Sequence, residues 1–88
     1  MRRNQMDIVK EILTVANISE VTKTQIVYKC NLSFEYAQKI LSNLVDERLL
    51  ELMEQKGKRT FKTTKKGSIF LKSLKEAYEI RSWNYEPE

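Results

Sequence analysis

Lysine and arginine are concentrated in one stretch of this sequence, residues 56–75, which holds eight basic side chains and no acidic one. Residues 1–55 carry seven basic and eight acidic side chains, and residues 76–88 carry one basic and four acidic side chains. Cations without counter-charges attract polyanions, and the phosphates of nucleic acid are the obvious partner. A solvated, lysine-rich helix face is the alternative interpretation. The basic residues are Lys56, Lys58, Arg59, Lys62, Lys65, Lys66, Lys72 and Lys75.

The residue types that enzymes use most for proton transfer and metal binding are scarce. The chain has no histidine and a single cysteine, Cys30, whereas zinc sites draw on both types and histidine is the commonest general acid–base residue. Neighbouring carboxylates such as Asp46 and Glu47 point apart on a helix, and a glycine-rich phosphate loop is missing from the sequence. We therefore expect a protein that is not an enzyme and that uses no metal or cofactor.

The length and composition are those of one small folded domain. Eighty-eight residues, 41% of them hydrophobic and 32% charged, allow one modest core. The apolar runs are too short to span a membrane, and the basic start leads into an amphipathic pattern rather than a signal peptide. Cys30 is expected to be a small buried residue in a reducing compartment. These features predict a cytoplasmic protein, associated with the nucleoid if its partner is DNA.

Capping signals in the centre of the chain predict two short helices close together. Residues 22–25 have the Thr-x-x-Gln pattern of a capping box, Asn31 suits the left-handed conformation that ends a helix, and Ser33 can cap the next helix. That helix, over 34–47, has an apolar stripe made of Phe34, Ala37, Ile40, Leu41, Leu44 and Val45. Two capped helices at this spacing indicate a helix-turn-helix.

The flanking elements complete a recognisable order. An amphipathic helix is expected after Asn4, and residues 17–21 could add a short strand. Alternating segments around a basic turn at Gly57 predict a β-hairpin with Phe61 facing inward. The expected fold is mainly α with a small β-hairpin: a winged helix-turn-helix over 1–64 with its wing near 50–63, a C-terminal extension helix over 65–83, and a tail at 84–88.

The segment Thr22–Lys29, followed by Asn31-Leu32-Ser33, resembles the pattern of small archaeal winged-helix DNA-binding proteins. That group includes ten-kilodalton chromatin-associated proteins and predicted transcriptional regulators. The similarity covers roughly residues 6–80 and includes Leu49-Leu50-Glu51 and Thr64-Lys65-Lys66-Gly67. It implies binding of double-stranded DNA and homodimerisation through an antiparallel coiled coil of the last helix. Helix-forming sequence stops near Ser82 here, so we expect a shorter dimer contact than in relatives with long coiled coils.

Candidate DNA contacts follow from the docking of a helix-turn-helix, whose second helix enters the major groove. On that helix the candidates, which suit base edges or phosphates, are Ser33, Tyr36, Lys39 and Asn43. The start of the preceding helix can seat a phosphate with Thr22, Lys23 and Thr24. The wing and its flank add the cations Lys56, Lys58, Arg59, Lys62, Lys65 and Lys66.

Several of these residues have an alternative role. Tyr36 could pack at the edge of the core, Asn43 could be a solvated polar residue, and Tyr28 is expected to fill the gap between helices. Carboxylates near Lys39 leave the groove-entering helix net negative, so we expect affinity to come mainly from the wing. The same acidity favours an alternative function, a winged-helix module that binds protein.

The C-terminal helix supplies the candidate dimer interface. Aromatic residues gathered late in a small chain are typical of subunit contacts, although they could also cover the domain's own core. The candidate interface residues are Phe70, Leu74, Ala77, Tyr78, Arg81, Trp83 and Tyr85.

Overall fold

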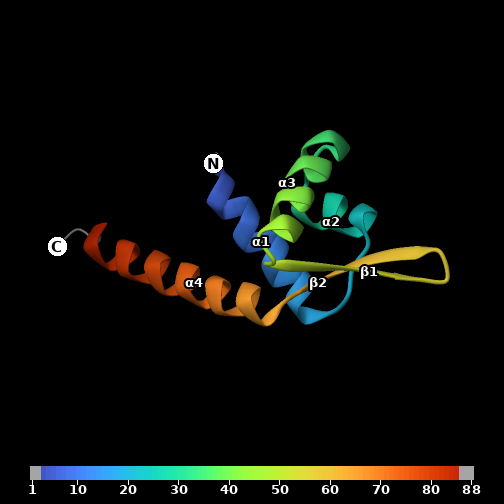
Figure 1. Ribbon diagram of the computed structural model, residues 1–88. Helices are drawn as coiled ribbons and strands as arrows, with labels where there is room; N and C mark the ends of the chain where they lie inside the picture. The colour runs from blue at the N-terminus through green and yellow to red at the C-terminus, as the bar shows by residue number, and fades with distance from the viewer. Residues whose placement is uncertain (1–2, 86–88) are drawn as a thin grey trace.

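The computed structural model describes the backbone of residues 3–85 and the side chains of residues 3–77 and 79 (Figure 1). Its elements follow the predicted order of three helices, a hairpin and a last helix, which confirms the predicted fold class. Their bounds are α1 Gln5–Ile18, α2 Lys23–Cys30, α3 Phe34–Asp46, β1 Leu50–Gln55, β2 Lys58–Thr63 and α4 Lys65–Tyr85.

The capping residues act as the sequence predicts. The Thr22 hydroxyl oxygen accepts from the Gln25 backbone N–H at 3.2 Å, and the Gln25 side chain accepts in return from the Thr22 N–H at 2.9 Å. Asn31 ends α2 in the left-handed conformation, with φ of 56°. The Ser33 hydroxyl oxygen then caps α3 at 3.1 Å. These bonds satisfy backbone groups that helix ends leave without partners, and they fix the turn between α2 and α3.

The core forms where α1, α2 and α3 pack together, with Ile12, Leu13, Ile26 and Leu41 among its buried side chains. Two sequence expectations about aromatic residues are wrong. Tyr28 is 77% exposed, because the buried positions of α2 lie on the opposite side of that helix. Phe34 is half exposed, because as the first residue of α3 it lies at the end of the apolar stripe.

The hairpin turns through two residues, Lys56 and Gly57. Lys56 and Gly57 have φ of 53° and 77°, the two positive angles of a type I′ turn, whose twist matches that of the flanking strands. Phe61 is buried, as predicted. The strand expected at 17–21 is reduced to one residue, because α1 continues to Ile18. Val21 pairs with Phe61 through two backbone hydrogen bonds of 3.1 and 2.7 Å.

The last helix projects from the rest of the molecule. It continues two residues past the expected end at position 83, to Tyr85. Figure 1 shows α4 extending in the direction opposite to the tip of the hairpin, and the molecule measures 56 × 26 × 20 Å. Near its start, α4 packs on α1 and buries Leu71. Among the described residues, no helix combines the length and apolar content needed to cross a bilayer.

Candidate nucleic-acid interface

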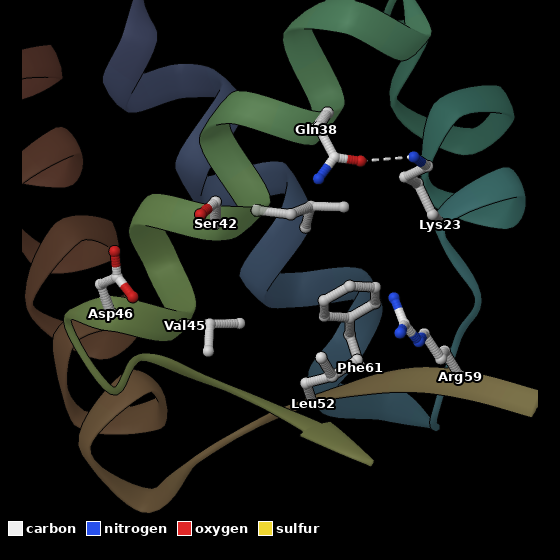
Figure 2. A pocket seen from close by; sticks show the side chains of 9 residues that line it. Lys23, Gln38, Ser42, Val45, Asp46, Leu52, Arg59 and Phe61 are labelled. Atoms are coloured by element: carbon white, nitrogen blue, oxygen red, sulfur yellow. Dashed lines mark hydrogen bonds between the residues drawn. The ribbon is translucent and has the colours of Figure 1, made fainter. Parts of the chain in front are cut away.

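A hollow of about 310 Å³ lies between α3, the first turn of α2 and one face of the hairpin (Figure 2). It brings together helix-turn-helix and wing residues that are up to 38 positions apart in the sequence. The lining residues are Lys23, Gln38, Leu41, Ser42, Val45, Asp46, Leu52, Arg59 and Phe61. Residues of α3 and of the hairpin therefore share one surface.

The outer face of α3 carries the exposed polar residues expected to meet a groove. Lys39 and Asn43 are both exposed. Ser33 is exposed too, and its oxygen accepts the Tyr36 N–H while its own proton remains available for donation. Tyr36 itself is half-buried and packs against the core. The burial of Tyr36 thus supports the alternative role, packing at the edge of the core, over a DNA contact.

The first turn of α2 is connected directly to α3. The Lys23 ammonium donates to the Gln38 side-chain oxygen at 2.6 Å, which leaves two of its three protons for other acceptors. Thr22 uses its hydroxyl oxygen to cap its own helix, and Thr24 is exposed. Lys23 is therefore the residue of this turn that the structure places at the shared hollow.

The cations of the wing fall on two faces of the hairpin, because successive strand residues point to opposite sides. Arg59 shares a face with Phe61 and lines the hollow beside α3. Lys58 and Lys62 are exposed on the other face, and Lys56 is exposed in the turn. Arg59 has a loose ion pair with its cross-strand neighbour Glu54, with 3.9 Å between Nε and the carboxylate oxygen. Such an exposed pair contributes little free energy, so Arg59 can exchange it for another anion.

Lys65 and Lys66 lie at the start of α4, and Lys66 has a structural role that the sequence did not suggest. Its ammonium donates to the Glu47 backbone carbonyl at 2.9 Å, at the end of α3. The Thr64 hydroxyl, just before α4, donates to the Arg48 carbonyl at 2.6 Å and accepts from the Gly67 N–H at 2.9 Å. Lys65 is exposed and keeps its place among the candidate phosphate contacts.

The candidate contacts inferred from the sequence do not include Gln38 or Ser42 of α3. Both line the hollow beside Asp46. The available signal was their spacing of four residues, 38, 42 and 46, which places them on one side of a helix. The position of the hairpin relative to that side was not available from the sequence.

Other candidate chemistry is limited within the described part of the chain. Cys30 is buried, as expected, and burial raises the pKa of its thiol, with the Glu11 carboxylate acting in the same direction. Among the described residues, no cluster of three or more metal-ligating side chains occurs.

The candidate dimer residues lie along α4. Phe70 and Leu74 are half-buried against the core, and Ala77 is exposed. The side chains of the remaining four candidates lie outside the described residues: Tyr78, Arg81, Trp83 and Tyr85.

A family model described as winged helix-turn-helix matches residues 2–82. The chain belongs to the winged helix-turn-helix family. An uncharacterized protein of Methanocaldococcus jannaschii, MJ0287, is 30% identical over 79 residues, which cover 90% of this chain and 77% of that protein. Sso10a-2, a DNA-binding protein from Sulfolobus solfataricus, is similar in structure, with a TM-score of 0.83 and 25% identity over 94% of this chain and 86% of its own.

A further similar structure is F93 from STIV, described as a winged-helix DNA-binding protein. It has a TM-score of 0.72 and 17% identity, over 89% of this chain and 92% of its own, so that likeness concerns the fold. These similarities confirm the resemblance to small archaeal winged-helix proteins that the sequence suggested.

Proposed function

We propose that this winged helix-turn-helix protein binds double-stranded DNA through α3 and the hairpin, as a transcriptional regulator or a chromatin-associated protein of the nucleoid. The observation that carries the proposal is the single surface on which α3, Lys23 and Arg59 meet. The DNA-binding description of the structurally similar Sso10a-2 supports it. The activity is binding rather than catalysis.

In this mode of binding, α3 lies in the major groove with Lys39 and Asn43 toward the base edges. Asparagine can bond adenine with both amide atoms, and lysine can reach guanine or a phosphate. The phosphate backbone that borders the groove passes between α3 and the wing, within reach of Lys23 and Arg59. Lys56 at the wing tip then reaches the adjacent minor groove or backbone.

Affinity and sequence preference come from different parts of this surface. Glu35 and Asp46 against Lys39 leave α3 with a formal charge of −1, and carboxylates close to phosphates oppose binding. The wing and its flank supply the excess of cations. DNA binding is therefore driven mainly by phosphate neutralisation, with a weak sequence preference contributed by α3.

The test is the affinity for a duplex of arbitrary sequence, measured by fluorescence anisotropy from low to moderate salt. Neutralisation of phosphates releases counterions, so the logarithm of the association constant should fall linearly with the logarithm of salt concentration, by about 0.9 for each phosphate contacted. If the protein fails to bind duplex DNA even at the lowest salt, the proposal is wrong and a protein-binding role for the α3 surface takes its place.

The working form of the protein is proposed to be a homodimer joined through α4. Support comes from the length of α4, which runs beyond the part that packs on α1. Along it, Leu74, Tyr78, Arg81 and Tyr85 follow one another at steps of three or four residues, the spacing of one helix face. A partner helix can cover that face where the domain's own core ends.

A further inference from the structure

The hollow between α3 and the hairpin is more apolar than a phosphate-binding surface requires. Leu41 and Phe61 are buried at its base, and Val45 is half-buried beside them. Leu52, the cross-strand partner of Phe61, remains 43% exposed there. Exposed apolar surface in a concave site contributes little to binding a phosphate but favours a ligand with an apolar body.

The polar groups of the hollow are divided between its two ends. Figure 2 shows Lys23 and Arg59 on one side and Asp46 on the other. The Lys23 ammonium has protons to spare beyond its bond to Gln38, and Arg59 is held only by its loose pair with Glu54. The cationic end therefore suits a carboxylate, whereas the Asp46 end repels one.

We propose that this hollow is a binding site for a small amphipathic carboxylate, a ligand with an aromatic or branched apolar body. The carboxylate meets Lys23 and Arg59, and the apolar body lies over Leu52 and Val45. About 310 Å³ lies at the lower end of the volumes of small-molecule sites, which limits the ligand to about one ring and its substituents.

The ligand has a regulatory consequence that rests on the proposed DNA binding. Lys23 and Arg59 cannot engage the ligand's carboxylate and a DNA phosphate at the same time. The apolar part of the ligand, bound between α3 and the hairpin, also occupies the space through which the DNA backbone passes. The ligand is therefore a competitor of DNA, and a duplex should bind less tightly in its presence.

Phenylacetate is the probe, titrated into the free protein while the backbone amide resonances are followed by NMR. We expect saturable shifts centred on Gln38, Ser42, Leu52 and Arg59, with a dissociation constant on the order of 1 mM for so small a ligand. Inorganic phosphate lacks the apolar body and 2-phenylethylamine carries the wrong charge, so neither should saturate the same resonances at these concentrations.

Paired substitutions separate the site from general charge effects. Lys23→Gln with Arg59→Gln should raise the dissociation constant of phenylacetate about tenfold, since two charge-assisted contacts are lost. Lys29→Gln with Lys75→Gln removes the same charge at exposed positions elsewhere and should leave the constant unchanged. The ligand site is overturned if both double variants lose phenylacetate affinity equally. It is also overturned if inorganic phosphate saturates the same resonances as tightly as phenylacetate.

Competition is measured separately, as duplex affinity of the wild-type protein with and without saturating phenylacetate. The control contains sodium chloride at the same concentration in place of phenylacetate. A duplex affinity weaker than in this control supports the competition. An unchanged affinity overturns it even if phenylacetate binds. Because the NMR titration contains no DNA, failure of DNA binding and failure of the ligand site give different results.

Discussion

Gly67 lies where α4 passes closest to the loop between α3 and β1. A Cβ atom at this position would overlap the Leu49 carbonyl oxygen and approach the Thr63 methyl carbon to 2.8 Å. The Leu49 carbonyl is held in place, since it accepts the Thr64 N–H at 3.1 Å. The crossing of α4 over this loop therefore depends on the missing side chain and not on an unusual backbone angle.

Gly67→Ala should lower the free energy of unfolding by about 1–3 kcal/mol, because the overlap outweighs alanine's better helix propensity. Urea denaturation followed by circular dichroism measures the change. Ser68→Ala, one residue along the same helix, is the control and should stay within about 0.5 kcal/mol of wild type. A Gly67→Ala variant as stable as this control would show that the junction has room to relax.

At the same scale, residue types predicted the helix caps well but gave the wrong exposure for Tyr28 and left that of Tyr36 open. Thr22, Asn31 and Ser33 act through neighbours within three or four positions, so the sequence contains everything that their role needs. Tyr28 and Tyr36 depend on what packs against each helix. The sequence alone does not give those packing partners. In the structure, Tyr28 is open to solvent and Tyr36 is half-buried.

Among the elements, the hairpin combines a short, well-defined turn with cations on both of its faces. The exposed positions and the positive φ angles of Lys56 and Gly57 leave Lys56, Lys58 and Arg59 outside the core. Their chemistry can therefore be changed with little effect on packing. The site was predictable to the extent that the wing is basic and follows a helix-turn-helix, whereas the hollow shared by Arg59 and Gln38 required the hairpin's orientation.

Replacement of Lys56, Lys58 and Arg59 together by alanine should weaken duplex binding on every sequence by about 10- to 100-fold. It should also reduce the slope of log affinity against log salt concentration by up to about 2.7, because each phosphate contact contributes about 0.9. Anisotropy titrations at several salt concentrations measure both. Lys29, Lys72 and Lys75, all exposed away from the hollow, are changed to alanine as a control of equal net charge. Equal effects of the two triple substitutions would show that the wing is not part of the DNA interface.

On the scale of the whole molecule, α4 gives an elongated shape to a chain whose core is otherwise built from α1, α2, α3 and the hairpin. The part of α4 nearest the domain is covered by α1 and β2. Its continuation to Tyr85 adds helix without adding to the described core. In the proposed dimer, this continuation of α4 packs against a second copy of the chain.

Ala77→Glu introduces a charge into the proposed dimer contact at an exposed position, so the monomer should keep its fold. Light scattering after size exclusion should show about twice the 10.5 kDa chain mass for the wild type and a shift toward the monomer for the variant. Lys72→Glu, on the other side of α4, is the control and should keep the wild-type mass. A wild-type mass of one chain at all concentrations contradicts the proposed dimer.

The hydrogen bonds of Thr64 and Lys66 to the end of α3 have a mechanical consequence. The start of α4 meets the segment that follows α3 across the hairpin that separates the two helices in sequence. A hinge motion there would break the bonds to the Arg48 and Glu47 carbonyls and open the close packing at Gly67. These bonds tie the first turn of α4 to the chain just past the end of α3. The direction in which α4 leaves the domain is therefore set by contacts within one chain.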